Sequence, residues 1–286
     1  MTSTTFPSKI FIDGGDPQET IYAKKALGFI DGQTTNPTLI SKNPEVQKRI
    51  IKGEKFTSDE AYGMYKSVVA EISPVVSWSV SIETYSDQNT KAREMIAQAR
   101  QMYAWIPNAW IKLPTTSEGL KAAEVLSKDG MRLNMTLCFS QEQAAAVYAA
   151  TRGAEKGQIF VSPFVGRLDD RGENGMQLIE NILKMYESGD GHVMTLTASL
   201  RNLNHHFLSF RLKSPVITLP FKVFKMWEEE KFKLPDPDWK YDPGQLNPIP
   251  YKELDLNKSW SAFDIHHDLT DIGITRFAAD WNALVK

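Results

Sequence analysis

A lysine interrupts an apolar run at residues 109–116, which read AWIKLPTT. Such positions inside strands are normally filled by Val or Ile, because removing an ammonium group from water is costly. Either Lys112 lies at a strand end and extends its amine to water, or its burial serves chemistry. Burial favours the neutral amine, which can attack a carbonyl carbon and form an iminium. Because an iminium acts as an electron sink, Lys112 is a candidate for making or breaking carbon–carbon bonds.

An acid near the start of the chain offers a second interpretation of this lysine. Asp13 ends the apolar run 9–13, and a buried ion pair between Asp13 and Lys112 would be a purely structural arrangement. The two interpretations are compatible, because proton transfer also requires an acid beside the amine.

Polar residues also gather where other apolar runs end. Besides Asp13 and Lys112, they are Thr35, Asn36, Ser77, Ser79, Ser81, Asn134, Thr136, Ser162, Arg167, Ser199 and Arg201. Any one Ser, Thr or Asn alone is also typical of a turn or a helix cap. Alternate residues of a strand face the same side, so Asn134 and Thr136 can share an interior, as can Ser162 and Phe164. The agreement among several run ends predicts a functional site.

The runs that carry these residues are candidate strands. They span residues 9–13, 28–34, 75–81, 109–115, 132–138, 158–165, 193–200 and 215–220. Amphipathic segments with helical spacing lie between them, which is typical of repeated βα units around a parallel sheet. We therefore predict an α/β fold, a (β/α)8 barrel formed as one domain by residues 1–286. A doubly wound open sheet is the alternative, but no GxGxxG motif follows the first run.

Residues 231–268 break the βα rhythm. Prolines forbid a long helix there, and the large aromatics Trp239, Tyr241, Tyr251 and Trp260 argue against a disordered linker. We expect an ordered, irregular insertion that acts as a lid or an oligomer contact, followed by a final helix at about 269–284.

Composition limits the function classes. The chain has 286 residues, is 42% hydrophobic and carries a formal charge of -2, so neither a nucleic-acid surface nor a polybasic membrane signal is expected. Cys138 is the sole cysteine, which excludes an intrachain disulfide. The histidine pairs at 205–206 and 266–267 are adjacent in sequence and do not share a face, so we expect no metal site. The start MTSTTFPSK lacks an apolar run of signal-peptide length, so we expect a cytoplasmic protein acting on small molecules.

At this point the motifs resemble a known family, the transaldolases, including the small transaldolases and the fructose 6-phosphate aldolases. The matching segments are TTNPTLI (34–40), WIKLPTTSEGLKA (110–122), LNMTLCFSQEQA (133–144), SPFVGRLDD (162–170), ASLRN (198–202) and DLTDIGITRFAADW (268–281). The resemblance implies a class I aldolase-type enzyme that works through a lysine Schiff base, with no metal or organic cofactor, in carbohydrate metabolism such as the pentose phosphate pathway.

The resemblance also implies roles for individual residues. Lys112 matches the Schiff-base lysine, Asp13 the acid/base, and Thr136 the residue that helps to hold a catalytic water. The expected substrate-binding residues are Asn36 and Asn134 for sugar hydroxyls, with Thr35 beside them, Ser162 and Phe164 at the dihydroxyacetone end, and Arg167, Ser199 and Arg201 at the phosphate. Arginine suits the last task independently, because it binds phosphate through two parallel hydrogen bonds.

One position departs from the family pattern. Transaldolases present a glutamate from the third strand, and the alignment through VSWSV places Ser79 there, so Ser79 is expected to line the substrate pocket. A serine cannot serve as a general acid near neutral pH. Glu83 has the same parity as Ser79 and offers another carboxylate if a loop rearrangement brings it inward.

Three functions remain open from the sequence. The first is a transaldolase that moves a dihydroxyacetone unit between sugar phosphates or similar anionic sugars. The second is a Schiff-base aldolase or transaldolase with an altered ketose substrate, favoured by Ser79 and by the insertion at 231–268. The third is a catalytically weak sugar-phosphate-binding or scaffold protein. The expected partners are an anionic ketose, an aldehyde acceptor and further copies of the chain in a homo-oligomer, with no nucleic acid and no membrane.

Overall fold

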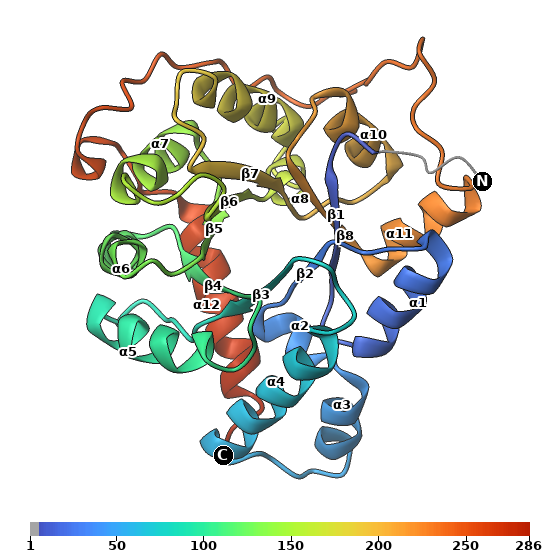
Figure 1. Ribbon diagram of the computed structural model, residues 1–286, viewed down its shortest axis with the longest axis vertical. Helices are drawn as coiled ribbons and strands as arrows, with labels where there is room; N and C mark the ends of the chain where they lie inside the picture. The colour runs from blue at the N-terminus through green and yellow to red at the C-terminus, as the bar shows by residue number, and fades with distance from the viewer. Residues whose placement is uncertain (1–5) are drawn as a thin grey trace.

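Eight parallel strands form a closed barrel in the order β1 to β8 (Figure 1). The computed structural model describes residues 6–286, so the first five residues of the MTSTTFPSK start lie outside the described part. The strands are β1 Lys9–Asp13, β2 Gly32–Thr34, β3 Ser79–Glu83, β4 Ala109–Pro114, β5 Leu133–Cys138, β6 Ile159–Pro163, β7 Val193–Thr197 and β8 Val216–Pro220. The closed sheet confirms the predicted (β/α)8 barrel and excludes the open sheet.

Helices surround this barrel (Figure 1). Their bounds are α1 Pro17–Leu27, α2 Pro37–Ser41, α3 Pro44–Ile51, α4 Ser58–Ile72, α5 Ala92–Tyr103, α6 Ser117–Lys128, α7 Gln141–Ala150, α8 Val165–Asp169, α9 Gly175–Tyr186, α10 Leu203–Arg211, α11 Phe221–Glu229, the 3-10 turn η1 Trp260–Ala262, and α12 Asp268–Asn282. No helix within 6–286 combines the length and the apolar character needed to cross a membrane.

Aromatic side chains fill one part of the barrel core. Trp110 stacks on Phe160 with ring centroids 5.5 Å apart, and Phe11 and Trp78 pack edge-on against Phe160. Gly32 makes room for this cluster, because a Cβ there would lie 2.5 Å from the Phe11 ring. The barrel is therefore packed solid where these rings meet, and polar side chains enter it from the other end of the strands.

The third strand differs from its predicted position. We predicted it at 75–81, but it runs from Ser79 to Glu83 because the preceding residues form a turn in which the Val75 amide donates to Ile72 O. Its register pairs Ser79 with Gly32, and Glu83 with Lys112. Inward-facing and outward-facing residues alternate in the same way from the predicted start at 75 and from the observed start at 79, so the pattern alone did not fix where this strand begins.

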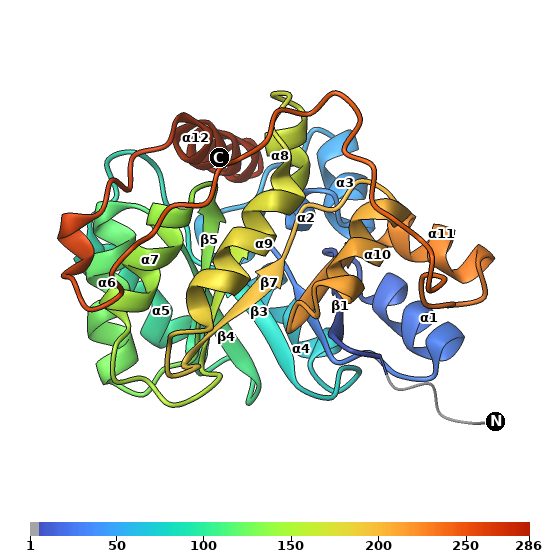
Figure 2. The same ribbon diagram turned by 90° about the horizontal axis from the view of Figure 1, so that it is seen from above.

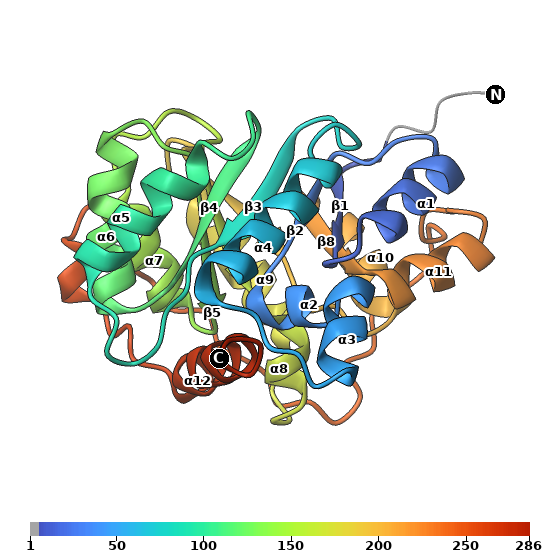
Figure 3. The ribbon, with the colours of Figure 1, turned by 90° about the horizontal axis from the view of Figure 1, so that it is seen from below.

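The irregular segment before α12 lies along the outer helices (Figure 2). Ile249 exchanges hydrogen bonds with α9, Lys252 with α7, and Trp260 donates to Glu124 on α6. The helix that follows reaches the strand ends instead, since Thr270 Oγ1 donates to Leu137 O at 2.9 Å. The predicted final helix at 269–284 is confirmed as α12, and it lies across the end of the barrel (Figures 2 and 3).

Candidate active site

Lys112 lies inside the barrel and not at its rim. The residue is 2% exposed, on strand β4, so the option of an amine extended to water is wrong. Its Nζ lies 3.1 Å from Glu83 Oε2 and donates to the carbonyl oxygen of Thr35 at 3.2 Å. The amine is thus held by one carboxylate and one backbone carbonyl and is shielded from bulk solvent.

Glu83 supplies the carboxylate that the sequence alignment assigned to the Ser79 position. It is the last residue of β3 and stands beside Lys112 in register, so no loop rearrangement is required. Ser79 begins the same strand, and at about 3.3 Å of rise per residue it lies roughly 13 Å away along β3. Its hydroxyl is buried without a hydrogen-bond partner in the described residues. Ser79 therefore lies away from Lys112 along β3, and the glutamate that the alignment found missing stands beside that lysine as Glu83.

Two acids near the lysine hold their protons more tightly than usual. Burial raises the pKa of Glu83 to about 7, although the charge of Lys112 opposes this and that of Asp13 adds to it. Burial also raises the pKa of Asp13, against the effects of Lys112 and of a hydrogen bond from Thr34. That bond joins Thr34 Oγ1 to Asp13 Oδ1 at 2.7 Å. The site therefore places two carboxyl groups with raised pKa values around one amine, and that of Glu83 lies near neutral pH.

A row of polar side chains crosses the neighbouring strands. Ser162 Oγ donates to Asn134 Oδ1 at 2.6 Å, and Asn134 Nδ2 donates to Ser81 Oγ at 3.0 Å. Asn134 pairs with Lys112 in register. On the same strand as Asn134, the buried hydroxyl of Thr136 has no partner among the described residues. Asn134, Thr136 and Ser162 lie on adjoining strands, as predicted, and the Thr136 hydroxyl remains available to a ligand.

Tyr65 is a part of the site that sequence reasoning missed. Its hydroxyl accepts from the Glu83 amide at 2.9 Å and lies 2.6 Å from Thr35 Oγ1. Because Thr35 Oγ1 donates its proton to Ser81 O, Tyr65 is the donor in the pair with Thr35. The Thr35 side chain is therefore occupied within the scaffold, and its carbonyl group is the part that meets Lys112.

Asn36 also has a structural task. Its Oδ1 accepts from the Leu39 amide at 2.9 Å, which caps the N-terminus of α2. This is the ordinary cap role that a single Asn after a strand predicts.

The expected phosphate residues lie at the mouth of the barrel. Arg167 on α8 lies between two aromatic rings, with its Cζ 5.7 Å from the centroid of Phe164 and 5.7 Å from that of Phe277. No carboxylate of residues 6–286 lies within ion-pair distance of Arg167. Arg201 pairs with Asp170 at 2.8 Å, and Ser199 adopts a positive φ of 60° just before it. Arg167 is thus a half-buried cation available to an anionic ligand.

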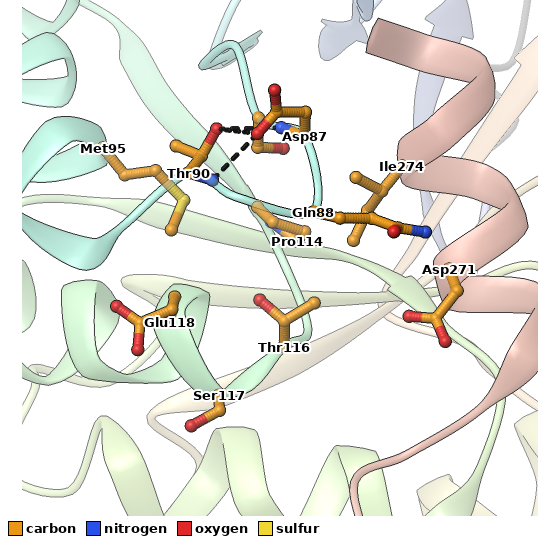
Figure 4. Close-up of a pocket in the computed structure, with 11 residues that line it drawn as sticks. Asp87, Gln88, Thr90, Met95, Pro114, Thr116, Ser117, Glu118, Asp271 and Ile274 are labelled. Carbon is orange, nitrogen blue, oxygen red and sulfur yellow. Dashed lines mark hydrogen bonds between the residues drawn. The ribbon is translucent and has the colours of Figure 1, made fainter.

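A separate cavity of about 340 Å³ opens beside the site (Figure 4). It lies between the loop after β3, the start of α6 and helix α12, and Asp87, Thr116 and Asp271 are among the residues around it. Pro114 of β4 borders it, whereas Lys112 does not. The described residues contain no cluster of His, Cys, Asp and Glu side chains suited to a metal ion.

The fold and the site together define a (β/α)8 barrel protein with a buried lysine–carboxylate centre at its strand ends. Comparison with known proteins narrows this class. Residues 10–286 match the family described as transaldolase/fructose-6-phosphate aldolase, and the chain belongs to that family. The resemblance seen in the motifs is therefore confirmed.

Its relatives match along nearly their full length. A probable transaldolase of Dehalococcoides mccartyi is 34% identical over 279 residues, which cover 97% of this chain and 100% of that protein. Two further probable transaldolases are similar to this chain. That of Thermoplasma volcanium is 34% identical, and the match covers 96% of this chain and 95% of that protein. That of Methanococcus vannielii is 33% identical, and the match covers 97% of this chain and 99% of that protein.

Proposed function

We propose that the protein is a class I transaldolase that forms a Schiff base between Lys112 and an anionic ketose and passes a dihydroxyacetone unit to an aldehyde acceptor. One observation carries this proposal. The buried Nζ of Lys112 lies 3.1 Å from Glu83, and burial raises the pKa of that carboxyl group to about 7. A shared proton can therefore leave the amine for the carboxylate, which gives a neutral nucleophile beside a protonated acid.

The first half of the reaction uses this pair. The neutral Lys112 amine attacks the ketose carbonyl, and the hydroxyl of the resulting carbinolamine leaves as water with a proton from Glu83. Thr136, whose buried hydroxyl has no partner among residues 6–286, lies on the neighbouring strand β5 and is suited to hold that water. The product is an iminium at the ketose C2 carbon.

The second half breaks a carbon–carbon bond. Asp13 takes the proton of the hydroxyl on the carbon beyond the bond, and the electrons of that bond move into the iminium to leave an enamine and a free aldehyde. Attack of the enamine on an acceptor aldehyde reverses these steps. We assign Asn134 and Ser162, which are joined by a hydrogen bond, to the hydroxyls of the bound dihydroxyacetone unit. Arg167, Ser199 and Arg201 are assigned to the phosphate of the sugar.

The two rival functions lose their main support. Weak catalysis rested on a serine in place of the glutamate, and an altered ketose substrate rested on that serine together with the 231–268 insertion. Glu83 occupies the place beside Lys112 that the serine argument had left empty.

Borohydride trapping tests the proposal. Incubation with fructose 6-phosphate and borohydride, followed by peptide mapping, should place the reduced adduct on Lys112, whereas Lys112→Arg should give none. An adduct on another lysine, or none with several ketose phosphates, would refute the Schiff-base function.

A further inference from the structure

Helix α12 packs on Arg167 of α8 at the mouth of the barrel, because the Phe277 ring lies 5.7 Å from the Arg167 Cζ. A Cβ added at Gly273 would lie 3.2 Å from Arg167 Nη1 and 2.6 Å from Leu137 Cδ2, so the helix can approach this closely because the residue is glycine. One turn later, the Phe277 ring covers the Arg167 guanidinium. The side of α12 that faces the site is therefore set by Gly273 and Phe277.

Arg276 lies on the same side of the helix. It follows Gly273 by three residues and precedes Asp280 by four, and residues at these spacings line one ridge of a helix. The far end of the ridge contacts α2, where Thr38 Oγ1 donates to Asp280. The ridge thus extends from Arg167 on α8 to Thr38 on α2, and Arg276 stands between them at the end of the barrel.

The charges near Arg276 are poorly balanced. Its side chain is 59% exposed, and its ion pair within the described residues is a loose one, 3.9 Å from Asp280. Burial lowers the pKa of Arg167, and the charges of Arg276 and then of Arg201 lower it further. The charges of Arg276 and of Arg201 thus both repel that of Arg167 at the mouth, and Asp170 is closely paired to Arg201. A doubly charged anion placed among them would relieve this repulsion.

We propose that Arg276 is a third arginine of the anion-binding subsite, and that it makes the enzyme select ketoses carrying a terminal phosphate over those uncharged at that end. The inference rests on the proposed function, because it assigns α12 a part in binding the same substrate. Arg276 acts on binding and lies away from the Lys112 amine, so it should affect KM and leave kcat nearly unchanged.

Charge removal at this position tests the inference. Arg276→Gln should weaken the binding of inorganic phosphate, measured by calorimetry, by roughly fivefold, since an exposed charge-assisted contact contributes modestly. KM for fructose 6-phosphate should rise by a similar factor, and KM for fructose should not change. Arg276→Lys should restore part of the loss. The matched control is Lys25→Gln, which removes an exposed cation from the last turn of α1 and should change neither ligand.

The outcomes separate this inference from the proposed function. Unchanged phosphate affinity in Arg276→Gln would overturn the inference, and so would equal KM increases for both ketoses or an equal loss in Lys25→Gln. Borohydride trapping on Lys112 reports on the Schiff base alone, so it should succeed in Arg276→Gln at saturating ketose. Failure of trapping in the unmodified protein would refute the proposed function, while phosphate binding that depends on Arg276 would still support the subsite.

Discussion

Replacing Glu83 by Gln keeps the size of the side chain but removes a proton carrier beside Lys112. The amine keeps its hydrogen bond to Thr35 O, so the nucleophile should remain in place. With Gln, however, the acid assigned to protonate the departing hydroxyl of the carbinolamine is gone. The step that should slow is therefore the formation of the Schiff base, and the cleavage step through Asp13 should be affected less.

The size of the loss follows from the number of acids present. A positioned acid–base group contributes roughly 10²–10⁴-fold, and Asp13, whose pKa is also raised by burial, remains nearby as a second proton donor. We therefore expect kcat/KM to fall by about 10²–10³-fold in Glu83→Gln. Lys112→Met should remove activity altogether, because no other group takes over the covalent step.

The pH dependence of kcat/KM is a sharper test of the role of Glu83. Since the pKa of Glu83 is about 7, the pair with Lys112 holds two protons below that pH and one above it. The state with one proton can place a neutral amine beside a protonated carboxyl group, whereas the state with two cannot. The unmodified enzyme should therefore lose kcat/KM as the pH falls below about 7, and this acid limb should vanish or move in Glu83→Gln.

Steady-state assays with fructose 6-phosphate and an aldehyde acceptor between pH 5 and pH 9 would measure both effects, with circular dichroism to confirm that the variant folds. Borohydride trapping over time would show whether imine formation is the slowed step. The reasoning is refuted if Glu83→Gln keeps more than a tenth of the activity and the same acid limb.

Three further changes test other parts of the structure. Arg201→Ala should raise KM roughly tenfold for a phosphorylated ketose and barely for an unphosphorylated one, and equal effects would contradict its assignment to the phosphate. Ser79→Ala should leave kcat/KM within about twofold, because the hydroxyl has no hydrogen-bond partner in the described part of the chain and lies at the other end of β3 from Glu83. A large kinetic loss would return Ser79 to the site. Burial beside the ring of Trp227 lowers the pKa of His206 from 6.5 to about 3. Between these two pH values the imidazole binds a proton in the unfolded chain but not in the folded protein, so the folded state loses stability as the pH falls. Urea unfolding between pH 6.5 and pH 4 should therefore show that the free energy of unfolding falls less steeply in His206→Phe than in the unmodified protein, by up to about 1.4 kcal/mol per pH unit. Equal pH dependence in the two proteins would show that the imidazole is charged in the folded state.

The barrel could be predicted because eight apolar runs with helices between them have few alternative folds. The polar residues at the run ends were equally informative for Lys112, Asn134 and Ser162, since a parallel barrel brings the ends of all its strands together. Residues such as Asn36 were harder to interpret, because a polar side chain after a strand serves a helix cap as readily as a ligand.

The error at the third strand has a physical cause. Side chains alternate with a period of two, so a strand shifted by four residues keeps the same faces and the same apparent pattern. Ser79 and Glu83 both point into the barrel, and what distinguishes them is their height along the strand, which the pairing of Glu83 with Lys112 fixes. Height is set by hydrogen bonds from other elements, such as that from Ser79 N to Asp31 O, and local sequence does not encode it.

Tyr65 shows why the support of a site is harder to predict than its reactive groups. It lies on α4, far from the strand ends in sequence, and in isolation it would be interpreted as a core residue on the apolar face of a helix. Its hydroxyl nevertheless joins the backbone of Glu83 to the side chain of Thr35, the two residues whose oxygen atoms hold the Lys112 amine. A shift of either partner would alter the 3.1 Å separation on which the proton exchange depends. Burial raises the pKa of Glu83, and a buried hydrogen-bond network is needed to hold this residue in position. That network includes the Tyr65 hydroxyl, which comes from a helix outside the barrel.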